Sequence, residues 1–248
     1  MDDPQLQQRL AAETRFTRLV HLSSCASTQD VAAEEPAGDV CVWADLQEAG
    51  RGRKGRSWSG SPGKDVEVTF RASLDAVDRP LRLAPVLATA VVVALESFAG
   101  TGLSLDWPND VVHNGRKLCG ILVDAAGSRD VDLLIGIGVN VNRTGFPPEL
   151  LERATSLGLI SGRIHDRATV VLRLGQSIDA ALRAFEEGRL DDYVPFFRAR
   201  LGLCGRRVRI TTVTGSTHEG VLEDIDLEQL LLGGARFPLA AIEALERI

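Results

Sequence analysis

The pattern of hydrophobic residues changes near residue 201, and this change limits the possible folds more than any other feature of the chain. Before it, helical periodicity alternates with runs of strand-forming residues; after it, short strand-like runs are separated only by turn residues. We therefore expect an α/β (α+β) domain over residues 1–200, with a mixed sheet flanked by helices, and a small β-barrel domain over residues 201–248. The expected helices are residues 5–13, 82–99, 168–187 and 190–200, and the expected strands are residues 16–22, 39–46, 66–70, 103–106, 118–125 and 131–142.

Local signals refine three of these elements. Val66, Val68 and Phe70 alternate with polar residues, which predicts a half-buried strand. The NGR sequence at residues 114–116 predicts a tight hairpin turn. Residues 82–99 carry a long apolar stretch typical of a buried helix, and Pro85 falls near its first turn, where proline is tolerated.

The composition limits the class of protein. The 248 residues are 44% hydrophobic and 25% charged, as in ordinary soluble globular proteins, and the net charge of −6 argues against a general nucleic-acid binder. The four cysteines show no CxxC pair and no metal-site spacing with histidines, so we expect small buried side chains rather than disulfides or zinc ligands. The acidic N-terminus is unlike a signal peptide, and the longest apolar run, residues 87–95, is too short to cross a membrane. We expect a cytoplasmic protein with neither a membrane nor a nucleic-acid partner.

Residues 50–58 (GRGRKGRSW) form a basic glycine-rich segment that predicts an anion-binding loop. Arg51, Arg53, Lys54 and Arg56 can surround an anion with positive charge, while the glycines let backbone N–H groups approach it. A solvated charged loop explains isolated cations but not the interleaved glycines. A phosphate-binding P-loop needs a lysine where Arg56 stands, and the SGSPG that follows cannot begin the required helix. An RNA-binding patch needs aromatic stacking residues, and aromatic residues are only 5% of the chain.

At this segment the chain resembles the biotin protein ligases, whose signature loop has the form GRGRxGRxW. The resemblance continues in the same order along nearly the whole chain, and this colinear set is far more specific than any single motif. The further matches are STQ at residues 27–29, ADLQEA at 44–49, WPND at 107–110, RKLCGIL at 116–122, GIGVNVN at 136–142, ATSL at 154–157, and an SH3-like C-terminal barrel from residue 205 onward.

The resemblance implies an enzyme that forms biotinyl-5'-AMP from biotin and Mg-ATP and then transfers biotin to a specific lysine of a biotin carboxyl carrier protein. A carboxylate acylates an amine poorly, and an acyl-adenylate supplies a good leaving group while crowding anionic oxygens together. Preorganised cations stabilise the charge that develops. The catalytic residues implied by the resemblance are Lys117, Arg51 and Arg53.

The resemblance also implies binding residues. Biotin's ring requires hydrogen-bonding groups in an otherwise apolar pocket, and Mg²⁺ binds few carboxylates beside phosphate oxygens. The implied biotin contacts are Ser27, Thr28, Gln29, Gln47, Arg51, Gly52, Arg53, Trp58, Lys117 and Gly120. The implied ATP contacts are Arg53, Arg56, Trp107, Asn109, Lys117 and Asn140, and the implied Mg²⁺ ligand is Asp110. Trp58 could equally be a core or loop-anchoring residue, and Asp110 a turn former.

Two positions depart from the family pattern. Asp106 stands where the family commonly has a lysine, and Glu67 stands where many relatives carry an aromatic or other uncharged residue. An unpaired glutamate is costly beside an apolar ligand. We expect each carboxylate either to face solvent or to pair with a nearby cation such as Arg56 or Arg71.

Several alternatives remain open at this point. A lipoate or octanoate ligase would share the α/β domain, and a catalytically silent biotin-binding regulator would fit the two departures. Only about twenty residues precede the catalytic strand, too few for the N-terminal DNA-binding domain of some relatives, so we expect a monofunctional ligase. The expected partner is the biotin carboxyl carrier domain of a carboxylase, and both a monomer and a homodimer are compatible with the sequence.

Overall fold

A seven-stranded mixed sheet forms the centre of the molecule in the computed structural model, which describes residues 3–74, 82–126 and 131–248. The strand order is β1-β2-β3-β7-β6-β5-β4; β1 and β2 are parallel, and every other neighbouring pair is antiparallel. The predicted mixed sheet is thus confirmed. Its strands are β1 (Arg18–Leu22), β2 (Val40–Ala44), β3 (Val66–Leu74), β4 (Leu103–Asp106), β5 (Asp110–His113), β6 (Arg116–Ala126) and β7 (Val131–Val139).

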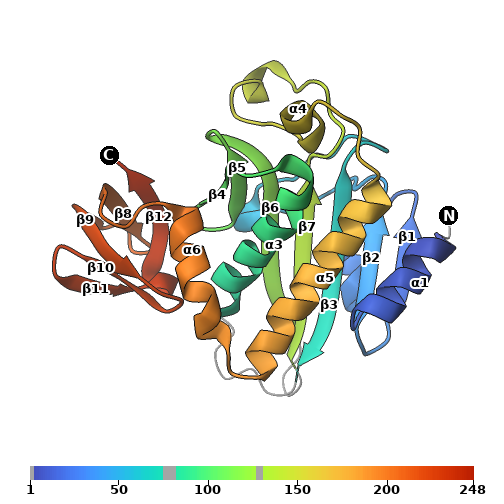
Figure 1. Cartoon of the computed structure of the whole chain (residues 1–248), viewed down its shortest axis with the longest axis horizontal. Helices are drawn as coiled ribbons and strands as arrows, with labels where there is room; N and C mark the ends of the chain where they lie inside the picture. Colours follow the sequence, from blue (N-terminus) through green and yellow to red (C-terminus); the bar gives the residue numbers. More distant parts are fainter. Residues whose placement is uncertain (1–2, 75–81, 127–130) are drawn as a thin grey trace.

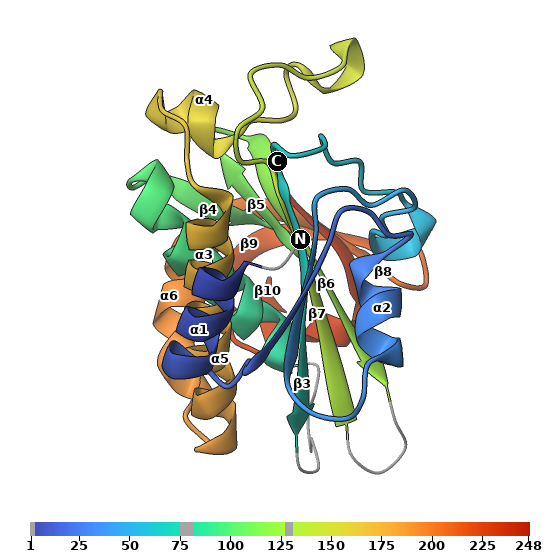
Figure 2. The ribbon, with the colours of Figure 1, turned by 90° about the vertical axis from the view of Figure 1, so that its right-hand side faces the viewer.

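Helices cover the two faces of this sheet unequally. The longer helices α1, α3 and α5, together with α6, stand on one face, and the short α2 stands on the other (Figures 1 and 2). No helix in the described ranges has the length and apolarity needed to cross a bilayer. The α-helices are α1 (Pro4–Glu13), α2 (Thr28–Glu34), α3 (Leu83–Ala99), α4 (Leu157–Ser161), α5 (Arg167–Glu186) and α6 (Val194–Leu201), and the 3-10 turns are η1 (Arg53–Gly55), η3 (Pro148–Leu150), η4 (Leu190–Tyr193) and η5 (Leu239–Ala241).

Helical periodicity located the long helices well. The predicted helices at 5–13, 82–99 and 168–187 correspond to α1, α3 and α5, and Pro85 is the third residue of α3. The predicted helix at 190–200 is divided into η4 and α6. The short α2 is absent from the predicted elements, because its seven residues are too few to show a period.

The prediction of a half-buried strand at Val66 to Phe70 is wrong, because β3 is buried on both faces. The side chains of Val66, Val68 and Phe70 belong to the main core, while Glu67 is only 2% exposed on the opposite face. β3 lies between β2 and β7, and α2 packs against it. Polar residues on this strand are therefore enclosed, and their burial matters for the site.

The NGR turn is confirmed, and the strand after it is the predicted one at residues 118–125, but the strand before it is not the predicted one at 103–106. Asn114 and Gly115 have φ values of 50° and 75°, as a type I′ hairpin turn requires, and they connect β5 to β6. The four-residue β5 is missing from the prediction. It begins at Asp110, inside the WPND motif, so the motif ends on a strand.

The C-terminal part forms a second sheet of five antiparallel strands in the order β11-β10-β9-β8-β12. The edge strands β11 and β12 do not pair within residues 201–248, so the expected β domain is present without a hydrogen-bonded closure of the barrel. One continuous hydrophobic cluster includes buried residues of both sheets. The strands are β8 (Arg207–Thr212), β9 (Thr217–Ile225), β10 (Gln229–Leu232), β11 (Ala235–Pro238) and β12 (Ile242–Arg247).

All four cysteines are free thiols, as expected. Cys41 and Cys119 are buried in the core, as the sequence predicts. The expectation of burial is wrong for Cys204, which is exposed, and Cys25 is only half-buried. Cys204 follows α6 in the turn that leads into the second sheet, where little packs over it.

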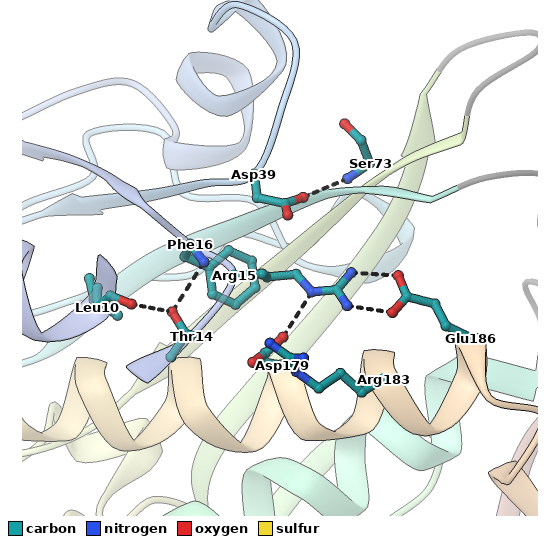
Figure 3. Close-up of polar contacts among 9 residues, drawn as sticks. All are labelled: Leu10, Thr14, Arg15, Phe16, Asp39, Ser73, Asp179, Arg183 and Glu186. Carbon is teal, nitrogen blue, oxygen red and sulfur yellow. Dashed lines mark hydrogen bonds and ion pairs between the residues drawn. The ribbon is translucent and has the colours of Figure 1, made fainter. Parts of the chain in front are cut away.

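An arginine network fixes the segment between α1 and β1 against α5 (Figure 3). The Arg15 guanidinium donates to Asp179 Oδ1 at 2.8 Å and to both carboxylate oxygens of Glu186 at 2.8 and 2.6 Å. Arg183 binds the other oxygen of Asp179 at 3.0 Å, so this buried carboxylate has a cation on each side. The network holds the edge of the sheet to its covering helix.

A buried ion pair anchors the chain that connects the glycine-rich loop to β3. Asp65 is 1% exposed and forms an ion pair with Arg143, which lies just after β7. Its carboxylate also accepts from the Ser61 N–H at 2.7 Å and the Val141 N–H at 3.1 Å. Arg143 in turn donates to the carbonyl of Ser59. The return of the loop to the sheet therefore depends on one enclosed carboxylate.

We predict that Asp65→Ala lowers the free energy of unfolding by about 3–5 kcal/mol, because it leaves the Arg143 charge buried without a partner. Asp192→Ala is the control, since its ion pair with Arg189 is exposed, and it should leave the free energy of unfolding almost unchanged. Urea unfolding measures both. Equal costs for the two variants would show that Asp65 does not anchor the loop.

Candidate active site

A cavity of about 440 Å³ lies between the α2 side of the central sheet, the glycine-rich loop, the WPND turn and β12 of the second sheet. Every residue that the sequence assigned to the site lines this cavity except Asn140. Residues from well-separated segments of the chain thus meet at one place. The predicted residues on its wall are Ser27, Thr28, Gln29, Gln47, Arg51, Gly52, Arg53, Arg56, Trp58, Trp107, Asn109, Asp110, Lys117 and Gly120.

Three glycines on β6 and β7 form the floor of the cavity. A Cβ at Gly138 would lie 2.3 Å from Cε2 of Trp58, and one at Gly120 would lie 3.2 Å from Cζ3 of the same ring. A Cβ at Gly136 would lie 3.1 Å from Cδ of Gln29. Gly120 and Gly138 are cross-strand partners, so together they leave a strip of bare backbone. Only glycine permits this approach of Trp58 and Gln29 to the sheet.

The glycine-rich loop is folded back on itself. Gly52 N–H donates to the Arg56 carbonyl at 2.8 Å, and Trp58 N–H donates to the Gly50 carbonyl at 2.8 Å. η1 forms the tip, where Gly55 has a φ of 71°. Extended chain follows the loop and no helix begins there, which agrees with the sequence argument against a P-loop.

The arginines of this loop are exposed at the cavity wall. Arg51 forms an ion pair with Asp30 of α2 at 2.7 Å, and both side chains are about half exposed. Arg53 and Arg56 are exposed and line the cavity without an ion pair inside the described ranges. The cations therefore face the space that a ligand would enter.

Lys117 occupies an ordered position at the start of β6. Its backbone N–H donates to the Arg153 carbonyl at 2.8 Å, and its carbonyl accepts from the Thr155 N–H at 2.9 Å. Its ammonium lies 2.7 Å from Asp110 Oδ2 and 5.7 Å from the centre of the Trp58 ring. The ATSL motif thus serves as a backbone support that aims the lysine into the cavity.

The polar end of the cavity is built around Gln47. Its Oε1 accepts from the Thr28 N–H at 2.7 Å and from the Thr28 hydroxyl at 3.0 Å. That hydroxyl also lies 2.8 Å from the Thr69 hydroxyl. Ser27 caps α2 through a 3.3 Å contact with the Gln29 N–H. Gln29 itself is buried and donates to the carbonyls of Leu122 and Leu134 at 3.3 and 3.4 Å.

Comparison with known proteins identifies the family. The family model for biotin/lipoate A/B protein ligases matches residues 22–142. The bifunctional ligase/repressor BirA of Bacillus spizizenii is 33% identical over 94% of this chain and 74% of its own length. The chain belongs to the biotin/lipoate A/B protein ligase family.

Two further relatives support the same assignment for this ligase-family chain. The biotin--[acetyl-CoA-carboxylase] ligase of Mycobacterium tuberculosis is 30% identical over 89% of this chain and 80% of that protein. The biotin protein ligase of Aquifex aeolicus, solved in complex with biotin and ATP, superposes with a TM-score of 0.80 and 30% identity. It covers 94% of this chain and 100% of that one, so the likeness includes both sheets.

Asn140, predicted to contact the nucleotide, lies behind the cavity wall in this ligase-family chain, and its contact with the nucleotide stays a prediction. Asn140 is 5% exposed and its side-chain amide donates to the Thr155 carbonyl at 3.0 Å and the Lys117 carbonyl at 3.4 Å. It joins the end of β7 to the ATSL segment and so supports Lys117 from behind. The side chain is used within the protein and does not reach the cavity wall.

Neither departure from the family pattern pairs with Arg56 or Arg71. Asp106 is exposed at the cavity, so the expectation that it faces solvent is confirmed. Its pKa is raised by partial desolvation and by the Asp110 carboxylate, while Lys117 opposes the rise. Glu67 does not face solvent: its Oε2 accepts from the Gln47 N–H at 2.7 Å. Arg71 instead pairs with Asp132.

Several residues of the cavity wall were not predicted from the sequence. Arg153 precedes the ATSL motif, and Glu243, Ala244 and Glu246 come from β12 of the second sheet. The β12 residues lie more than a hundred positions from Lys117 in the chain, and neither periodicity nor a motif in the sequence predicts that they share a cavity. The charged character of Arg153 beside a family motif was the one available hint.

A dedicated metal cage is not present in the described ranges, where no three His, Cys, Asp or Glu side chains gather as metal ligands. Asp110 and Asp106 are cross-strand partners at the cavity, which places two carboxylates at neighbouring backbone positions. A Mg²⁺ ion held by one or two carboxylates plus substrate phosphates fits this donor set. The assignment of Asp110 to Mg²⁺ stays a prediction.

We predict that Gly138→Ala lowers the free energy of unfolding by about 1–3 kcal/mol, because the added methyl group overlaps the Trp58 ring. In a Trp58→Ala background the same change should cost less than about 1 kcal/mol. Gly145→Ala is the matched control, since a Cβ there meets nothing within 4 Å. Urea unfolding of the four variants measures these costs. An undiminished cost without Trp58 would contradict the proposed contact.

Proposed function

We propose that this chain is an ATP-dependent biotin protein ligase, which forms biotinyl-5'-AMP and transfers biotin to a lysine of a biotin carboxyl carrier protein. The main support for this proposal is that motif residues from separate segments of the chain line one cavity. Its wall includes both cationic side chains and the Gln47 amide. Relatives whose names state biotin ligation, and a solved relative with biotin and ATP bound, support it.

In the first step the carboxylate of biotin attacks the α-phosphorus of ATP and pyrophosphate leaves. The assigned role of Lys117 and of the loop residues Arg51 and Arg53 is to stabilise the negative charge that accumulates on the phosphate and carboxylate oxygens. Two of these cations now pair with carboxylates, Lys117 with Asp110 and Arg51 with Asp30. Both pairs are partly exposed, so substrate oxygens can replace these carboxylates at small cost. A Mg²⁺ ion at Asp110 would supply further charge neutralisation.

In the second step the acceptor lysine amine attacks the acyl carbon of the adenylate and AMP leaves. The mixed anhydride must be protected from water until the acceptor arrives. The glycine-rich loop borders the cavity and its backbone bonds are few, so the loop is suited to close over the intermediate. As acceptor we propose the biotin-carrier domain of a carboxylase, because relatives are named for acetyl-CoA carboxylase.

The decisive experiment is pyrophosphate release from Mg-ATP by the purified protein with biotin, lipoate or octanoate supplied in parallel. We expect release with biotin alone. Release with lipoate or octanoate would indicate the other branch of the family. A folded protein that binds biotin but releases no pyrophosphate would be a silent biotin-binding regulator instead.

We predict that Lys117→Ala slows adenylate formation by about 10²–10³-fold, because it removes a cation aimed at the developing charge. Lys64→Ala is the matched control, since Lys64 is exposed and lies outside the cavity wall. Biotin-dependent pyrophosphate release gives the rate, and circular dichroism verifies the fold. Near-normal release by Lys117→Ala would remove this lysine from the mechanism.

A further inference from the structure

Gln47 is held from two directions, and this double restraint points to a role for a residue that the family pattern does not explain. On one side Thr28 donates twice to the side-chain oxygen of Gln47. On the other side the Glu67 carboxylate accepts from the backbone N–H of Gln47 at 2.7 Å. Gln47 follows β2 and forms an isolated β-bridge with Cys25, in which Leu46 and Glu48 make the main-chain hydrogen bonds. The N–H of Gln47 itself takes no part in this bridge, so Glu67 is its acceptor.

The orientation of the Gln47 amide follows from the donors around it. A backbone N–H can only donate, so the atom that faces Thr28 N must be the amide oxygen. The Thr28 hydroxyl donates its one hydrogen to the same oxygen. In the contact between the Thr28 and Thr69 hydroxyls, Thr69 must therefore be the donor. With its oxygen occupied, Gln47 can offer a ligand only the NH₂ end of its amide. That group also faces the Glu67 carboxyl, so one of its two hydrogens is left for a ligand.

Glu67 is an unusual anchor for this arrangement. It is 2% exposed, and its Oε1 has no hydrogen-bond partner within the described ranges. A Cβ at Gly60 would lie 2.3 Å from that oxygen, so the returning loop packs directly on the carboxyl group. Burial raises the pKa of Glu67. Hydrogen bonds from Gln47 oppose this rise, the backbone N–H contributing more than the side-chain amide.

If the side chain at position 67 served only to fill space, an apolar residue would be expected there rather than a glutamate. Burying one without a full set of partners is costly, and an apolar side chain of similar volume is often at least as stable. What an apolar side chain cannot do is accept the Gln47 N–H. The hydrogen bond to Gln47 is therefore the distinctive contribution of Glu67.

We propose that Glu67 is a positioning residue for biotin recognition: its carboxyl group fixes the backbone of Gln47 so that the amide NH₂ group of Gln47 meets the carbonyl of the ligand's distal ring. This inference rests on the proposed function. It also defines the ligand class, an acid whose far end carries a hydrogen-bond acceptor. A saturated chain such as octanoate leaves the fixed donors unpaired and is rejected.

The test compares Glu67→Met, which removes the acceptor at similar side-chain length, with Glu67→Gln, which keeps an acceptor oxygen. We expect Glu67→Met to weaken biotin binding about tenfold, measured by calorimetry, and Glu67→Gln to stay within about threefold of the parent. The KM for ATP should stay within about twofold in both, because Gln47 is not among the residues assigned to the nucleotide. Glu48→Met, a change at the exposed neighbour of Gln47, is the matched control.

A second readout does not depend on activity. Hydrogen exchange of the Gln47 backbone amide, followed by NMR, should be slow in the parent and Glu67→Gln and fast in Glu67→Met. Parent-like biotin binding by Glu67→Met, equal losses in Met and Gln variants, or a parallel loss for ATP would each overturn the proposal. Absence of pyrophosphate release from the parent would instead count against the proposed function, because binding and amide exchange still test the role of Glu67.

Discussion

The absence of side chains at three glycines on one face of β6 and β7 is the constraint on which the site depends. Gly120, Gly136 and Gly138 leave bare backbone in the middle of the sheet, and Trp58 and Gln29 lie directly on it. The opposite face is filled by the apolar side chains that pack against α3 and α5. A sheet with one packed face and one bare strip gives a rigid floor, and the surrounding loops supply the chemistry.

Exposure distinguishes ion pairs that stabilise the fold from ion pairs whose cation can bind a substrate instead. The side chains of Asp65 and Arg143 are 1% and 9% exposed, so breaking their pair leaves an uncompensated buried charge. Those of Arg51 and Asp30 are 47% and 52% exposed, and such pairs are worth at most about 1 kcal/mol. Loss of the first would disturb the loop's anchor, whereas the second can exchange Asp30 for a substrate anion with little change in stability.

Long helices, the hairpin turn and most of the cavity wall were predictable, because periodicity and motif residues are local signals. The enclosure of β3 was not, since alternation along a strand does not tell what covers its second face. Glu67 shows the consequence: its departure from the family was visible, but its bond to Gln47 depends on how the loop after β2 returns to the sheet. Asn140 also belongs to a family motif, but its hydrogen bond to the Thr155 carbonyl and its position behind the cavity wall could not be predicted from that motif.

The boundary proposed at residues 200 and 201 separates two hydrogen-bonded sheets without separating the site. Glu243 and Glu246 of β12 line the same cavity as Lys117, and the hydrophobic cluster is continuous across both sheets. Arg198 of α6 also donates to the Ile225 carbonyl at 2.6 Å. Because the second sheet supplies part of the wall, the shape and charge of the cavity depend on its docking. The two proposed domains are therefore expected to act as one catalytic unit.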